Sequence, residues 1–168
     1  MARARKVLVC ASAIGYYGNR GDGSLSEDAP AGEGFLPDVC REWEAAGSAA
    51  EHAGIRVVRL RIGVVLSPKG GALKKMLFPF KLGSGGRTGP GDQFMSWIAI
   101  DDLAAAIVPR IETDSLTGAV NALSPGAVTN KVFPKTPGKV RRRPALPPLP
   151  PLPPTTVVAG LAGAPLPR

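Results

Sequence analysis

Three hydroxyl-bearing side chains follow the first apolar run of the chain and are its first candidates for chemistry. The run is Val7–Cys10, and Ser12, Tyr16 and Tyr17 come shortly after it. An apolar, β-branched run without alternation is typical of a strand buried on both faces of a parallel sheet. Ligands of open α/β folds bind just beyond the carboxyl ends of such strands. Ser12 and Tyr17 are therefore catalytic candidates, and a turn residue and core packing are the alternative roles.

A helix and a second strand are predicted to position these residues. Phe35–Gly54 carries apolar residues at helical spacing, with Pro37 suited to the first turn and Gly54 to the end. The apolar stripe consists of Leu36, Val39, Cys40, Trp43, Ala46 and Ala50. Residues 55–60 have the composition of a strand. Strand, helix and strand in this order predict a βαβ unit of a parallel sheet.

Further elements are predicted in the second half of the chain. They are a β-rich run at Ile62–Leu66, a short helix at Gly71–Lys81, a strand at Phe94–Ile100, a helix over Asp102–Glu112 with Asp101 as its N-cap, and a strand at Ala119–Leu123. Pro109 lies inside the predicted helix over Asp102–Glu112, where a proline is unfavourable. The glycine-rich stretch Leu82–Gln93 lacks the GxxxxGK[ST] pattern of a phosphate loop, so we expect a flexible loop there.

The composition changes at residue 134, which predicts a domain over 1–133 and a Pro-rich tail over 134–168. The tail holds 11 of the 18 prolines, so it is expected to be disordered or polyproline II. Residues 1–114 hold 14 bases and 13 acids, a net charge of +1, and the rest of the +8 follows Asp114. This basic tail lacks the interleaved aromatic residues of a single-strand nucleic-acid binder. The spacing of Arg141, Pro144 and Pro147 matches an SH3-domain ligand, which is a partner hypothesis.

The bulk sequence excludes several classes of protein. A length of 168 residues suits one domain, and no apolar run is long enough for a membrane span. Met1–Lys6 is basic, but the apolar run behind it is too short for a signal peptide. Cys10 and Cys40 have no metal-ligand spacing and fit a reducing compartment, so we expect the cytoplasm or an organelle stroma or matrix. His52 is expected to face solvent.

The successive segments together resemble a known family. They are CASAIGYYG, FLPDVCREWEAA, RLRIGVVLSPKGGALKKMLFPFKLGSGG, FMSWIAIDDLAAAI and GAVNALSPGAVTN. From Val7 to Asn130 the chain resembles the epimerase-family proteins of the atypical short-chain dehydrogenase/reductase branch, which is related to nucleotide-sugar epimerases and also labelled cell-division-inhibitor-like. The resemblance implies an α/β fold with a partial Rossmann-type parallel sheet. It also implies that the N-terminal glycine-rich βαβ unit, which holds the pyrophosphate in that family, does not precede Val7.

The resemblance further implies a cofactor and its contacts. The cofactor would be NADP or NAD, held by residues near the carboxyl ends of the strands. The implied contact residues are Ser12, Tyr17 and the backbone of Ile62, Gly63 and Val64. An ordinary strand is the alternative role for Ile62–Val64.

The chain departs from the catalytic pattern of active relatives at several positions. Leu36 and Cys40 occupy the places of the Tyr and Lys of the YxxxK motif, and Ala13 matches the catalytic Ser or Thr better than Ser12 does. Val64 and Met95 replace an asparagine and a diphosphate-binding arginine. We therefore expect an NAD(P)-dependent epimerase/dehydratase-like protein with weak or no activity as this fragment. The alternatives are an interaction module working through the tail and a truncated gene product without function.

Overall fold

The computed structural model describes residues 6–81 and 90–133, and the chain divides into two compact units. One unit combines the residues up to Gly63 with Trp97–Ser124. The other combines the described residues of Val64–Ser96 with residues 125–133. The predicted tail from residue 134 lies outside the described residues, and so does the SH3-type motif at Arg141, Pro144 and Pro147.

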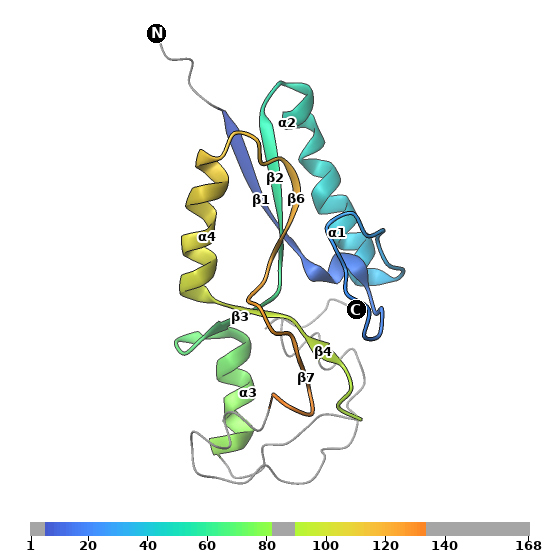
Figure 1. Ribbon diagram of the computed structural model, residues 1–168, viewed down its shortest axis with the longest axis vertical. Helices are drawn as coiled ribbons and strands as arrows, with labels where there is room; N and C mark the ends of the chain where they lie inside the picture. Colours follow the sequence, from blue (N-terminus) through green and yellow to red (C-terminus); the bar gives the residue numbers. More distant parts are fainter. Residues whose placement is uncertain (1–5, 82–89, 134–168) are drawn as a thin grey trace, which may run out of the picture. The chain divides into compact units, whose positions relative to one another are not determined.

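The first unit is built on a parallel sheet with the strand order β1-β2-β6. Its strands are β1 (Val7–Ala13), β2 (Arg56–Ile62) and β6 (Gly118–Ala122). Helices α1 (Phe35–Ala46) and α2 (Ser48–His52) lie on one face, and α4 (Ile100–Glu112) lies on the other (Figure 1). A short 3-10 helix η1 (Ile14–Tyr17) follows β1, and strand β5 (Trp97–Ala99) leads into α4. The predicted α/β class with a parallel sheet is confirmed.

The central strand β2 presents different side chains to the two helical layers. Arg56 donates to the carbonyls of Arg110 and Ile111 at the end of α4, so alternation puts Val58 and Leu60 on that face. Val57 lies on the opposite face, against Gly47 between α1 and α2. Val57 and Val58 are 0% exposed and Leu60 is 2% exposed, so the hydrophobic core lies on both sides of β2.

The predicted helix Phe35–Gly54 is divided, because the chain tightens at Gly47. The amide of Gly47 donates to the carbonyl of Glu44 at 3.3 Å, a bond of the 3-10 type, and α2 begins at the next residue. The predicted apolar stripe is also partly wrong. Trp43 and Leu36 are 59% and 45% exposed, whereas Pro37 and Cys40 on the inward side are buried.

Two further boundaries differ from the sequence prediction. Helix α4 begins at Ile100, so Asp101 and Asp102 lie in its first turn and Ala99 is the N-cap. The acids still lie at the positive end of the helix dipole. The predicted strand Phe94–Ile100 is split at Ser96 into β4 (Phe94–Met95) and β5.

The second unit contains β3 (Val64–Ser67), α3 (Gly71–Lys81), β4 and β7 (Val128–Thr129). Helix α3 packs against β3 and has the predicted bounds. Strands β4 and β7 pair antiparallel, with Phe94 opposite Thr129 and Met95 opposite Val128.

The described part of the chain has neither a membrane-length helix nor a metal cluster. Among residues 6–81 and 90–133, no helix has the length and apolar character needed to cross a bilayer. Within the same ranges no group of His, Cys, Asp and Glu side chains is placed to hold a metal ion. Cys10 and Cys40 are both free thiols.

Candidate functional site

Three polar side chains share one register row near the carboxyl ends of the parallel strands. Ser12 of β1 pairs with Arg61 of β2, and Arg61 pairs with Asn121 of β6. Paired residues of neighbouring strands project from the same face of a sheet, so these side chains lie side by side. This edge is where open α/β sheets bind their ligands.

Arg61 and Glu44 form a buried, two-pronged ion pair at the centre of this row. Arg61 Nε lies 2.9 Å from Glu44 Oε1, and Arg61 Nη2 lies 2.9 Å from Glu44 Oε2. The two side chains are only 5% and 11% exposed. Ser12 Oγ donates to Glu44 Oε1 at 2.7 Å, so the carboxylate has a partner on two sides. Such parallel charge-assisted bonds fix the orientation of both groups.

The tyrosines of η1 complete the surroundings of the guanidinium group. Arg61 Nη1 donates to the Tyr17 hydroxyl at 3.0 Å, and that hydroxyl donates to Asn121 Oδ1 at 2.7 Å. The guanidinium carbon lies 3.5 Å from the centre of the Tyr16 ring, a cation–π contact. The Arg61 side chain thus joins η1, α1, β2 and, through Tyr17, β6.

The loop between η1 and α1 closes over the same residues. Arg61 Nη1 also donates to the backbone carbonyl of Glu27 at 2.9 Å. The side-chain carboxylate of Glu27 accepts from the backbone amide of Asn121 at 2.9 Å. The loop returns to η1 where the Gly32 amide donates to the Tyr16 carbonyl. A Cβ at Gly32 would lie 2.4 Å from the Tyr17 carbonyl oxygen, so only glycine fits this close approach.

Glu44 and Arg61 stabilise each other's charged forms. Burial works against ionisation of Glu44, but the hydrogen bonds from Arg61 and Ser12 outweigh it and lower the pKa of the carboxyl group. Burial likewise opposes the charge on Arg61, and the bonds to Glu44 and Tyr17 raise its pKa above the ordinary value. Burial raises the pKa of the nearby Cys40 thiol above its ordinary value.

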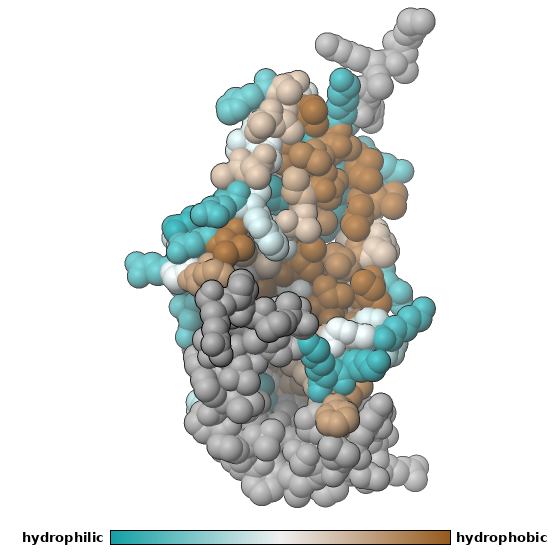
Figure 2. All heavy atoms as spheres, turned by 180° about the vertical axis from the view of Figure 1, so that it is seen from behind, coloured by the Kyte–Doolittle hydropathy of each residue, from teal (hydrophilic) through white to brown (hydrophobic). Residues whose placement is uncertain are grey.

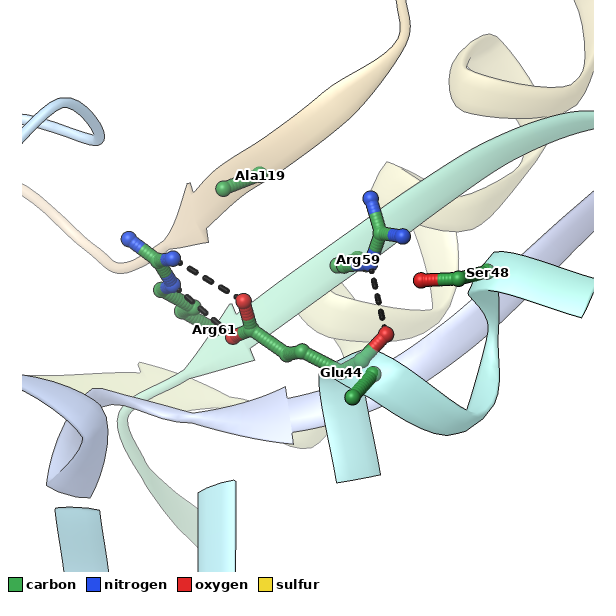
Figure 3. Close-up of a pocket in the computed structure, with 6 residues that line it drawn as sticks. Glu44, Ser48, Arg59, Arg61 and Ala119 are labelled. Atoms are coloured by element: carbon green, nitrogen blue, oxygen red, sulfur yellow. Dashed lines mark hydrogen bonds and ion pairs between the residues drawn. The ribbon is translucent and has the colours of Figure 1, made fainter. Parts of the chain in front are cut away.

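An open pocket of about 330 Å³ lies on this face of the sheet, beside the ion pair. Its lining residues are Glu44, Ala45, Ser48, Arg59, Arg61 and Ala119. Figure 3 shows Glu44 between the two arginines, with Ser48 on the α2 side and Ala119 on β6. Arg59 donates to the Glu44 carbonyl at 3.0 Å and pairs with Glu51 at 2.9 Å, so its charge is compensated within the fold.

The chain is similar to known epimerase-family proteins. No family model matches it. Epimerase family protein Mb2239 of Mycobacterium bovis is 45% identical over 137 residues, which cover 82% of this chain and 46% of that protein. Over the matched residues the chain is similar to these epimerase family proteins. It spans about half the length of the curated relatives it matches.

Two solved structures are similar to this chain in fold and sequence. Human epimerase family protein SDR39U1 (isoform 2) with NADPH has a TM-score of 0.78 at 34% identity, over 95% of this chain and 54% of that one. The nucleoside-diphosphate sugar epimerase of Corynebacterium glutamicum has a TM-score of 0.73 at 40% identity, over 80% of this chain and 29% of that one. The fold is Rossmann-like, as the resemblance implied.

The structure brings only some of the predicted site residues together. Ser12 and Tyr17 are 5% and 4% exposed and both join the Arg61 network. Ile62 is the last residue of β2, and the Gly63 amide donates to the Ala122 carbonyl at 3.2 Å. Val64 begins β3 in the second unit.

Sequence reasoning missed the central members of the network, which are Glu44, Arg61 and Asn121. Glu44 was overlooked because the predicted stripe excluded charged residues. A usable signal was present in β2, whose sequence RVVRLRI carries arginines inside an otherwise buried strand. A buried arginine requires a partner, so this pattern calls for a carboxylate on a neighbouring element.

Proposed function

We propose that this chain is an NAD(P)-dependent, epimerase/dehydratase-like oxidoreductase of the atypical short-chain dehydrogenase family, with weak or no activity when these residues act alone. The observation that carries the proposal is the likeness to the human family member with NADPH, at a TM-score of 0.78. The polar row at the carboxyl ends of β1, β2 and β6 supports it, because it lies where such sheets bind ligands.

The residues present do not fit the pyrophosphate of a dinucleotide. A pyrophosphate is bound by free backbone amides at the beginning of a helix. Gly15, Gly18 and Gly21 have a GxxGxxG spacing after β1, but Gly15 lies within η1, the other two follow it in a loop, and the next α-helix begins only at Phe35. The Gly18 amide already donates to the Gly15 carbonyl, and the Gly21 amide donates to Asn19 Oδ1. These amides are therefore committed within the loop.

Ser12 and Tyr17, with the backbone of Ile62 and Gly63, are the proposed residues nearest a nicotinamide. Both hydroxyl hydrogens are donated inside the protein, from Ser12 to Glu44 and from Tyr17 to Asn121. We infer that these side chains shape the floor of the site. The positions of the missing YxxxK pair offer no replacement, since Leu36 is an exposed hydrocarbon and the Cys40 thiol is buried.

Titration with NADPH and NADH tests the proposal, with the fluorescence of Trp43 and Trp97 as the signal. We expect a shallow change that does not saturate below about 1 mM, which corresponds to roughly −4 kcal/mol of binding free energy. Saturation at micromolar cofactor would contradict the proposed loss of the pyrophosphate site. A complete lack of response up to about 10 mM would contradict cofactor binding by this chain altogether. Cooperative urea unfolding of the same sample is the control for a folded protein.

A further inference from the structure

The open pocket beside the ion pair lies next to a second register row, one step nearer the amino ends of the strands. Arg59 of β2 pairs with Ala119 of β6. Side chains two residues apart on a strand project from the same face, so Arg59 shares the face of Arg61. The other side chains around the pocket are small, at Ala45, Ser48 and Ala119. A space of about 330 Å³ therefore stays open beside Arg59.

The Arg59 guanidinium is oriented by two contacts and still has unused donors. Its Nε donates to the Glu44 carbonyl at 3.0 Å, and its Nη1 lies 2.9 Å from Glu51 Oε1. A guanidinium carries five N–H donors, so these two contacts leave more than half of them free. Among the described residues, Nη2 of Arg59 has no hydrogen-bond partner. The Arg59 side chain is only 14% exposed, so the pocket is the side from which a ligand can reach these donors.

Ser48 adds a second unused polar group, and the nearby carboxylates leave room for a negative ligand. The Ser48 hydroxyl has no hydrogen-bond partner among the described residues, and Figure 3 shows its oxygen on the side of Arg59. Both oxygens of the Glu44 carboxylate are bound by Arg61. The Glu51 side chain is 39% exposed, and ion pairs of exposed carboxylates are weak. The carboxylate partner of Arg59 can therefore be displaced.

We propose that this pocket binds a small molecule carrying one oxyanion group, a phosphate or a carboxylate, through Arg59 and Ser48. A guanidinium forms two parallel, charge-assisted hydrogen bonds with either group, and the Ser48 hydroxyl is placed to donate to a further oxygen. Small-molecule sites occupy about 300–1,000 Å³, so the volume suits a ligand at the small end of that range. The site uses neither Ser12 nor Tyr17, so it stands independently of the proposed cofactor function.

Titration of the 168-residue chain with sodium phosphate and, separately, with sodium acetate tests the site at pH 7. The NMR signals of the Arg59 Nε–H and the Ser48 backbone amide report on the pocket. We expect both signals to shift with half-saturation at about 1–10 mM of at least one anion. Sodium chloride at the same ionic strength should give no saturable shift, because it only screens charges. The anion that binds more tightly identifies the ligand as a phosphate or a carboxylate.

Variants with opposite expected effects sharpen the test. Ala119→Leu fills the pocket and should weaken anion binding at least about tenfold. Glu51→Gln removes the carboxylate that competes for Arg59 and should strengthen binding by about two- to fivefold. Glu112→Gln makes the same change in net charge at the end of α4, on the other face of the sheet, and should alter binding by less than about 1.5-fold. Cooperative urea unfolding of each variant is the control for a folded protein.

Three results would overturn the proposal. The first is the absence of a saturable shift with both phosphate and acetate. The second is binding that Ala119→Leu leaves unchanged, which would put the anion outside the pocket. The third is equal strengthening by Glu51→Gln and Glu112→Gln, which would assign the effect to the net charge of the chain rather than to Arg59.

Discussion

The carboxyl end of β1 and its free edge differ in how many of their polar and apolar groups have a partner. At its carboxyl end, Ser12 joins a network in which Arg61 bonds to Glu44, Tyr17 and the Glu27 carbonyl. Along its free edge, β1 pairs with no strand among the described residues, and the neighbouring α4 carries an exposed apolar stripe (Figure 2). The first region is polar and closed, and the second is apolar and open.

The difference teaches which interactions this chain can complete by itself. Buried charges cannot be left unpaired, so the residues that satisfy Arg61 had to come from nearby elements of the same unit. An apolar surface can stay exposed to water at a moderate cost in free energy, so it can remain uncovered until a partner binds. The network is therefore expected to determine stability, and the open surface is expected to determine association.

The largest effect is expected from breaking the ion pair. Arg61→Met leaves the Glu44 carboxylate buried without its cation and should lower the free energy of unfolding by about 3–5 kcal/mol in urea denaturation. The double variant Arg61→Met with Glu44→Leu removes both charges and should recover at least about half of that loss. A double variant as unstable as Arg61→Met alone would show that packing around Arg61, rather than the charge pair, is what matters.

A smaller loss is expected at the loop that closes the network. Gly32→Ala places a methyl group 2.4 Å from the Tyr17 carbonyl oxygen and should lower the free energy of unfolding by about 2–3 kcal/mol. Gly23→Ala is the matched control in the same loop, since its nearest atom is 3.4 Å away, and it should change stability by less than about 0.5 kcal/mol. Equal effects from both variants would mean that the loop can shift to accommodate the methyl group.

The charge on Glu44 predicts a pH dependence with a definite sign. Its pKa is lower in the folded state, because the Arg61 and Ser12 bonds outweigh the effect of burial. Its contribution is therefore complete above the unfolded pKa of about 4.3 and is lost as the pH falls through the folded value. The difference in unfolding free energy between the wild type and Glu44→Gln should be constant from pH 7 to about 5 and shrink below about 4. A difference that grows on acidification would contradict the assignment.

The smallest effect on stability is expected on the open surface. Ile107→Lys changes a side chain that is already 36% exposed, so the free energy of unfolding should change by less than about 0.5 kcal/mol in urea denaturation. The same variant should reduce concentration-dependent light scattering, because it breaks an exposed apolar stripe. A loss of stability near that of Arg61→Met would show that α4 is covered within the chain.

Local pattern predicted most of the fold of the first unit. The apolar run Val7–Cys10, the helix beginning at Phe35 and the strand near Val57 and Val58 appear in the expected order and in a parallel sheet. The errors concern which face of a helix is buried and where a helix ends. Gly47 divides the long helix because the chain tightens there beside Val57. Trp43 was assigned inward by apolar character, although the inward side carries Cys40 and Glu44.

The sequence by itself determined most of the elements, the resemblance to epimerase-family proteins and the presence of Ser12 and Tyr17 at the end of a strand. Only the tertiary structure decided what those hydroxyls do, because their partners Glu44 and Asn121 are 32 and 104 residues away. Periodicity reports which side of one element is apolar and carries no information about which distant charge will face it. The contacts of Arg61 depend on the register of β2 between β1 and β6, and that register is fixed only when the sheet forms.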